Sequence, residues 1–198
     1  MKSITEYILE ANRDKYQQHK YEDVSQSAIF DYAQGFTSNV NDDLRKGKIR
    51  GDKQVIADLD NTFKSKWASN EKLDVYRTID WDYMKAIYNI TKENIDEHVG
   101  KTFVNKGYMS TTNTFQSPWG KRWQDNELIL HIVSEKAYPY IDINNCLKDD
   151  DEFDAKEQKE YLLPRDTKLE FVSYKVLTPK DDKQINKEGN YKLECKIV

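Results

Sequence analysis

The chain has 198 residues, of which 37% are hydrophobic and 12% aromatic, and its formal net charge is −4. This length suits one domain, and the aromatic residues supply enough apolar area for a core, which argues against intrinsic disorder over most of the chain. Charges of both signs are interspersed, so we expect no nucleic-acid binding of the kind that relies on bulk electrostatics.

Residue types and their spacing exclude several kinds of site. Cys146 and Cys195 lie far apart and the histidines are scattered, so we expect neither a disulfide framework nor a metal site. No apolar run reaches the length of about 18 residues that a membrane span needs. The polar start of the chain does not resemble a signal peptide, so the protein either stays in the cytosol of its source cell or had a signal removed. We expect a monomer.

The first 70 residues are predicted to be helical. Ser3 and Glu6 form a capping box before the first apolar positions. A second apolar stripe covers residues 29–33, a third segment runs from 38 to 47, and a fourth covers 55–63 at helical spacing.

After about residue 72 the chain consists of short stretches rich in β-branched and aromatic residues, which are typical of strands. The predicted strands cover residues 73–79, 127–133, 138–143, 159–164, 168–177 and 191–198. Helices followed by strands indicate the α+β class rather than a wound parallel sheet. We therefore expect one domain over residues 1–198, with a helical part (1–70) and a β-rich core (71–198).

Three fragments of the β-rich part carry polar side chains next to apolar ones. Arg77 lies in an otherwise apolar strand, Ser110 and Thr111 stand at a strand end, and Gln158 and Glu160 precede an apolar stretch. Each fragment alone is typical of a structural role, such as an ion pair, a turn or the exposed face of a strand. Gln158 and Glu160 are expected to share a face, because side chains alternate along a regular strand.

In this order, Arg77, Ser110-Thr111-Thr112 and Gln158-Lys159-Glu160 resemble the motifs of the mono-ADP-ribosyltransferase superfamily, most closely those of the single-domain exoenzyme toxins that modify Rho GTPases. The helical part adds a further motif of that family, Tyr32, Asn41 and Arg45. The resemblance implies two perpendicular β-sheets flanked by N-terminal helices. It also implies that NAD binds as a substrate in the cleft between the sheets, without a metal.

The resemblance implies NAD contacts on both sides of that cleft. Arg77 is expected to contact the phosphates, because a planar guanidinium suits a pair of anionic oxygens. Asn41 and Arg45 are expected to reach the diphosphate from the helical side. The remaining expected contacts are Ser110, Thr111, Glu160 and Arg122, the last in a loop over residues 113–126.

Glu160 is implied to be the catalytic glutamate, with Ser110 orienting it and Arg77 beside it. A fixed carboxylate near the ribose of NAD offsets the positive charge that develops as nicotinamide leaves. Gln158 is implied to hold the acceptor side chain. Its uncharged amide favours asparagine over arginine as the acceptor, whereas a strand bulge that brought Glu157 to the same face would undermine this choice.

The implied activity is transfer of ADP-ribose from NAD to a protein side chain, a glycosyltransferase reaction of a secreted or delivered toxin, with a small GTPase as the candidate target. Two features differ from the Rho-modifying enzymes: this chain is acidic, and Phe153 stands five positions before Gln158 in an acidic stretch. The target therefore stays open. The alternatives are a phage transferase acting on bacterial proteins, a non-catalytic NAD-fold binding module, and NAD hydrolysis without a protein acceptor.

Overall fold

The structure is a computed structural model that describes residues 21, 23–35, 38–47, 53–115, 128–149, 159–178 and 190–198. The helices are α2 (Val24–Ala33), α3 (Ser38–Arg45), α4 (Lys53–Thr62), α5 (Trp81–Tyr88), the 3-10 turn η1 (Ile95–His98) and α6 (Ile143–Cys146). The strands are β1 (Ala68–Glu71), β2 (Asp74–Ile79), β3 (Thr102–Asn105), β4 (Met109–Thr112), β5 (Leu128–Val133), β6 (Tyr138–Asp142), β7 (Glu160–Leu163), β8 (Thr167–Leu177) and β9 (Asn190–Ile197). The capping box predicted at Ser3 lies outside the described residues.

The described strands follow one another in the order β1-β6-β7-β4-β2-β5-β9-β8-β3. β5 and β9 pair in parallel, and the other neighbours are antiparallel. β2 and β4 share a single register pair, Tyr76 with Thr112. The strand order therefore divides there into a four-strand part (β1, β6, β7 and β4) and a five-strand part (β2, β5, β9, β8 and β3). The predicted α+β class is confirmed. Where two sheets were expected, the strands form one nine-stranded order whose two parts are joined at this one residue pair.

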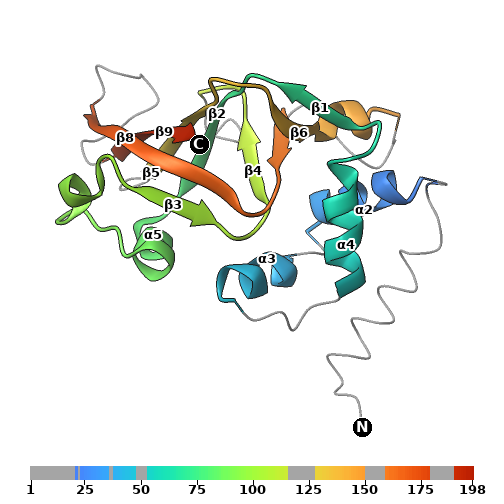
Figure 1. The fold of residues 1–198 in the computed structure, drawn as a ribbon, viewed down its shortest axis with the longest axis horizontal. Coiled ribbons are helices and arrows are strands. Elements are labelled where there is room, and N and C mark those ends of the chain that lie inside the picture. The colour runs from blue at the N-terminus through green and yellow to red at the C-terminus, as the bar shows by residue number, and fades with distance from the viewer. Residues whose placement is uncertain are drawn as a thin grey trace, which may run out of the picture.

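Helices α2, α3 and α4 gather on one side of the strands (Figure 1). α2 begins after Asp23, whose carboxylate accepts hydrogen bonds from the backbone of Ser25 and Gln26 and so satisfies two free N–H groups of the first turn. An apolar cluster joins these helices to Tyr108 just before β4 and to β6 and β7; its fully buried members include Ile29, Leu59, Tyr108, Ile141 and Leu162. The helical part is therefore fixed against the four-strand part of the sheet.

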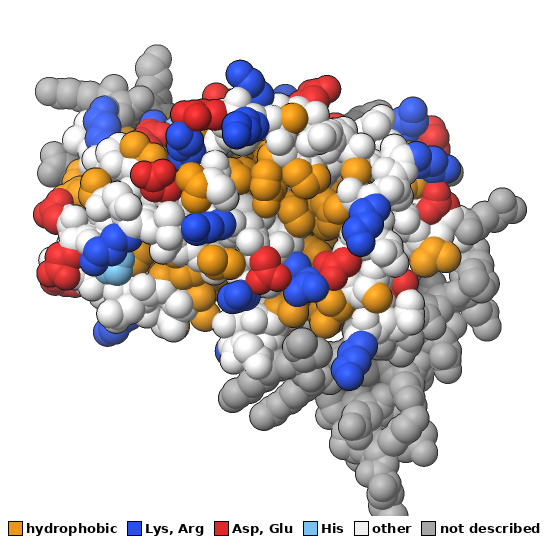
Figure 2. Space-filling model, viewed as in Figure 1, with side chains coloured by type: hydrophobic (Ala, Val, Ile, Leu, Met, Phe, Trp, Pro, Cys, Tyr) orange, Lys and Arg blue, Asp and Glu red, His pale blue; other side chains and the backbone are white. Residues whose placement is uncertain are grey.

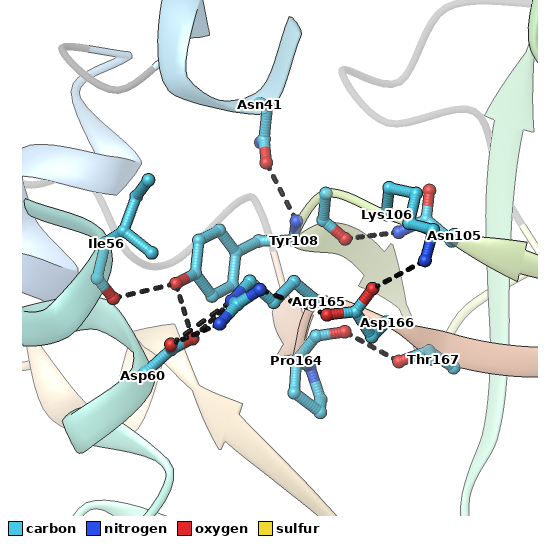
Figure 3. A network of polar contacts seen from close by, with 11 residues as sticks. Asn41, Ile56, Asp60, Asn105, Lys106, Tyr108, Pro164, Arg165, Asp166 and Thr167 are labelled. Atoms are coloured by element: carbon cyan, nitrogen blue, oxygen red, sulfur yellow. Dashed lines mark hydrogen bonds and ion pairs between the residues drawn. The ribbon is translucent and has the colours of Figure 1, made fainter. Parts of the chain in front are cut away.

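A polar network reinforces this junction (Figure 3). Arg165, in the turn between β7 and β8, donates from Nε and Nη2 to the carboxylate of Asp60 on α4, at 2.9 Å in each case. The hydroxyl of Tyr108 donates to the same carboxylate at 2.7 Å. Asp60 thus links α4 to two separate segments of the β-rich part.

Replacement of Asp60 by alanine is expected to lower the free energy of unfolding by about 1–2 kcal/mol, because it removes the acceptor that Arg165 and Tyr108 share and leaves them only Asp166 and the backbone oxygen of Ile56, respectively. Urea denaturation measures the change. The matched control is Asp58→Ala on the same helix, where one exposed hydrogen bond from Gln54 is lost. Equal losses in the two variants would contradict a special role for Asp60.

The surface of the described part mixes both signs of charge. On the face shown in Figure 2, lysine and arginine side chains alternate with aspartate and glutamate around a central apolar area. In the part of the chain that the structure describes, no helix is both long enough and apolar enough to cross a lipid bilayer.

Candidate active site

Arg77, Ser110 and Glu160 come together from β2, β4 and β7. Arg77 Nη1 donates a hydrogen bond to the backbone oxygen of Ser110 at 2.7 Å. β4 and β7 are paired so that Thr112 lies opposite Glu160, and Thr112 also forms the single register pair with β2. The three side chains that stand far apart in the sequence therefore meet beside the junction of the two sheet parts.

Glu160 lies in a largely desolvated position at the start of β7. Burial raises the pKa of its carboxyl above the ordinary value, while a hydrogen bond from Ser110 and the positive charge of Arg77 act in the opposite direction. The backbone N–H of Glu160 donates to Asn144 Oδ1 at 3.4 Å. A carboxylate held in this way acts on nearby charge more strongly than one in water, because the local dielectric constant is low.

Two residues of α3 hold the peptide groups on either side of Tyr108. Asn41 Oδ1 accepts a hydrogen bond from the backbone nitrogen of Tyr108 at 2.8 Å. Arg45 Nη2 donates to the backbone oxygen of Tyr108 at 3.3 Å. The predicted pair from the helical side therefore contacts the residue that precedes β4, two positions before Ser110.

Tyr32 connects this helical side to the strand residues. Its hydroxyl lies 3.0 Å from Ser110 Oγ and 3.3 Å from Asn41 Nδ2, which donates to it. The ring of Tyr32 packs edge-on against the ring of Tyr108, with 6.2 Å between the centroids. Residues of the helical motif and of the strand motif thus form one connected polar group.

The guanidinium of Arg45 has an N–H group that is available to a ligand. Among the described residues its buried Nε atom has no hydrogen-bond partner, and its Nη1 atom stands 3.7 Å from the carboxylate of Asp42. Gly107 allows a close approach here, because a Cβ atom at this position would stand 3.1 Å from that Nε atom. An unsatisfied buried guanidinium nitrogen fits an anionic ligand such as a diphosphate. Within the described ranges, no group of His, Cys, Asp or Glu side chains could hold a metal ion.

Some expected site residues are placed elsewhere or not described. The hydroxyl of Thr111 is buried and donates to the backbone oxygen of Tyr161 at 2.8 Å, so nothing in this geometry supports a contact between Thr111 and NAD. Arg122, Phe153, Glu157 and Gln158 lie outside the described residues.

The backbone at Lys159 does not support the regular strand geometry from which the position of Gln158 was predicted. β7 begins at Glu160, and Lys159 has a φ of 39°, in the left-handed region that non-glycine residues rarely adopt. Side chains alternate between faces only along extended backbone. The expectation that Gln158 and Glu160 share a face therefore loses its physical basis at Lys159.

Gly107 and Tyr108 are the site residues that the sequence motifs did not single out. A Cβ atom at Gly107 would stand 2.8 Å from Asn41 Oδ1, closer than real contacts allow. Tyr108 takes part mainly through its peptide groups, which leave no trace in side-chain patterns. The one available signal was a glycine placed directly before the strand that carries Ser110.

Comparison with known proteins agrees with this arrangement. The chain matches the family model described as ADP-ribosyltransferase exoenzyme over residues 10–194, and it belongs to that family. A comparison with curated protein sequences finds no match.

Solved structures show the same fold. The Clostridium limosum C3 exoenzyme is similar at 18% identity and a TM-score of 0.65, covering 100% of this chain and 96% of that one. C3stau2 from S. aureus, solved with NAD, has 19% identity and a TM-score of 0.65 over 100% of this chain and 97% of its own. Plx2a, an ADP-ribosyltransferase toxin from Paenibacillus larvae, has 18% identity and a TM-score of 0.66 over 93% and 90%.

Proposed function

We propose that this protein transfers ADP-ribose from NAD to a side chain of a target protein, and that Glu160 is its catalytic glutamate. The observation that carries the proposal is the meeting of Arg77, Ser110 and the desolvated Glu160 at one point of the fold, in a chain of the ADP-ribosyltransferase exoenzyme family. C3stau2, with the same fold, was solved with NAD, which supports NAD as the substrate here.

The residues divide into two groups by their chemistry. Arg77 and Arg45 supply guanidinium donors for the phosphates, with Asn41 holding the peptide beside them. Glu160 supplies the carboxylate that offsets positive charge on the ribose as the bond to nicotinamide lengthens. Ser110 orients that carboxylate. Arg122 in the loop over residues 113–126 is a further proposed phosphate contact.

Asparagine is the favoured acceptor, because Gln158 has an amide where arginine-modifying relatives mostly have a carboxylate. A small GTPase is the first candidate target, and action in the cytosol of a target cell after secretion or delivery follows from that choice. Peptide mass spectrometry of the modified protein tests the acceptor. ADP-ribose on asparagine is expected, and ADP-ribose on arginine would contradict the role given to Gln158.

Nicotinamide release by the purified protein tests the activity itself. We expect NAD cleavage that depends on Glu160 and increases when the target protein is added. No cleavage and no transfer in the presence of eukaryotic or bacterial lysate would contradict the proposal and favour a module that only binds a partner. Transfer to bacterial proteins alone would favour the phage enzyme.

Gly107→Ala is expected to raise the KM for NAD about 10-fold or more. The new Cβ atom would displace Asn41 Oδ1, which leaves the buried N–H of Tyr108 without its acceptor at a cost of about 1–3 kcal/mol. Initial rates of nicotinamide release measure the effect. Lys106→Ala, at the exposed neighbouring position, is the matched control. An unchanged KM in Gly107→Ala would contradict the importance of this close approach.

A further inference from the structure

A chain of hydrogen bonds leads from α3 to the catalytic carboxylate. It runs from the backbone nitrogen of Tyr108 to Asn41 (2.8 Å), from Asn41 to Tyr32 (3.3 Å) and from Tyr32 to Ser110 (3.0 Å). The hydroxyl of Ser110 in turn lies close enough to Glu160 to lower the pKa of its carboxyl. The chain thus connects an element of the helical part to Glu160 through residues on both sides of the site.

The direction of this chain is set at its start. A backbone N–H only donates, so the Asn41 atom that faces Tyr108 is the oxygen Oδ1. The Nδ2 atom of Asn41 therefore faces Tyr32 and donates to its hydroxyl oxygen. The peptide of Tyr108 in this way determines which end of the Asn41 amide points into the site.

The two hydroxyl protons follow from that orientation. If Ser110 gave its proton to Tyr32, the carboxylate of Glu160 would face a serine oxygen without a hydrogen, and the Tyr32 proton would have no acceptor among its described neighbours. If Tyr32 donates to Ser110 and Ser110 donates to Glu160, both protons have an acceptor. Buried polar groups adopt the satisfied arrangement.

We propose that Tyr32 is a positioning residue that fixes the Ser110 hydroxyl as a hydrogen-bond donor to Glu160. Its effect on the reaction rests on the proposed function, because it acts on the glutamate given the catalytic role there. Tyr32 itself contacts no reacting atom in this account. Its role is to keep Ser110 in the one rotamer and proton direction that support the carboxylate form of Glu160.

Tyr32→Phe tests the proposal, because the substitution removes one hydroxyl and keeps the ring that packs against Tyr108. We expect kcat for nicotinamide release to fall about 3- to 10-fold, the effect of one neutral hydrogen bond, with KM for NAD little changed. The pKa of Glu160, followed by carbon-13 NMR of its side-chain carboxyl, is expected to rise, because Ser110 then donates to it less often.

A double-variant cycle separates positioning from direct contact. Ser110→Ala is expected to raise the pKa of Glu160 as well, and adding Tyr32→Phe to it is expected to change neither kcat nor this pKa further. Tyr138→Phe is the matched control, because it removes a hydroxyl that also lies 3.0 Å from another hydroxyl, that of Thr167. The control is expected to leave the pKa of Glu160 unchanged.

Three results would overturn the proposal: an unchanged Glu160 pKa in Tyr32→Phe, additive effects in the double variant, or an equal shift in Tyr138→Phe. The NMR titration needs no NAD, so it decides the role of Tyr32 even where the wild-type protein fails to cleave NAD. A wild-type protein that does not cleave NAD would contradict the proposed function, while the titration would still decide whether Tyr32 positions Ser110.

Discussion

Glu160→Gln is expected to lower the rate constant for nicotinamide release about 10²- to 10³-fold, the usual loss when one group that stabilises developing charge is removed. Glutamine keeps the shape of the side chain and still accepts a hydrogen bond from Ser110, but it carries no negative charge to offset the positive charge on the ribose. Binding of NAD is expected to persist, because the arginine donors remain. Single-turnover kinetics and equilibrium titration with NAD separate the two quantities.

The same variant makes a prediction about stability. The pKa of Glu160 is raised in the folded protein by burial, so the group contributes most to stability below its unfolded pKa, and that contribution is lost as the pH rises through the folded pKa. At neutral pH the wild-type protein therefore carries a buried charge that glutamine lacks. We expect Glu160→Gln to unfold at the same or a higher temperature, and a loss of activity accompanied by clear destabilisation would contradict this account.

Replacement of Arg77 is expected to weaken NAD binding by about 10- to 100-fold, which corresponds to about 1.5–3 kcal/mol for a charged hydrogen bond. The guanidinium donates to the backbone oxygen of Ser110 with one nitrogen and has further donors for a phosphate. Lysine keeps the charge but lacks the planar fork, so both Arg77→Lys and Arg77→Met are expected to raise the KM for NAD.

The two Arg77 variants differ in their expected pH profiles. The charge of Arg77 lowers the pKa of Glu160, and activity needs the carboxylate form, so activity rises with pH through that pKa. In Arg77→Met the acidic limb of the kcat/KM profile is expected to move to higher pH, and in Arg77→Lys it moves less. Lys168→Met, at an exposed position of β8, is the control. Identical profiles in the two Arg77 variants would rule out the electrostatic part of this role.

Much of the fold followed from local patterns in the sequence. The segment predicted from residues 38 to 47 is α3, Ser38–Arg45, and the six predicted strands correspond to β2, β5, β6, β7, β8 and β9 with ends that differ by at most one residue. The patterns missed β1, β3, α5 and the short helices η1 and α6. β1 has the polar sequence Ala-Ser-Asn-Glu and forms by pairing with β6, which is a tertiary effect. α5 is rich in aromatic residues, and its start is marked only by Asp80, which accepts from the backbone of Tyr83 at 2.6 Å.

The candidate site was only partly visible in the sequence. Side-chain motifs in a fixed order indicated Arg77, Ser110 and Glu160, which the fold brings together. The contact of Tyr32 with Ser110 joins residues 78 positions apart, and Tyr108 acts through its peptide groups. The face of Gln158 was inferred from regular strand geometry, which the left-handed backbone of Lys159 interrupts. Long-range packing and backbone contacts of this kind leave no periodic signal.

The most direct test of the central claim is an incubation of cell lysate with NAD labelled in its adenylate part, using wild-type protein and Glu160→Gln at equal folded concentration. The account predicts label covalently bound to a lysate protein with the wild type, together with released nicotinamide, and a loss of both of at least about 10²-fold with the variant. Equal labelling by the two proteins would contradict the role of Glu160 and, with it, the mechanism proposed for this site.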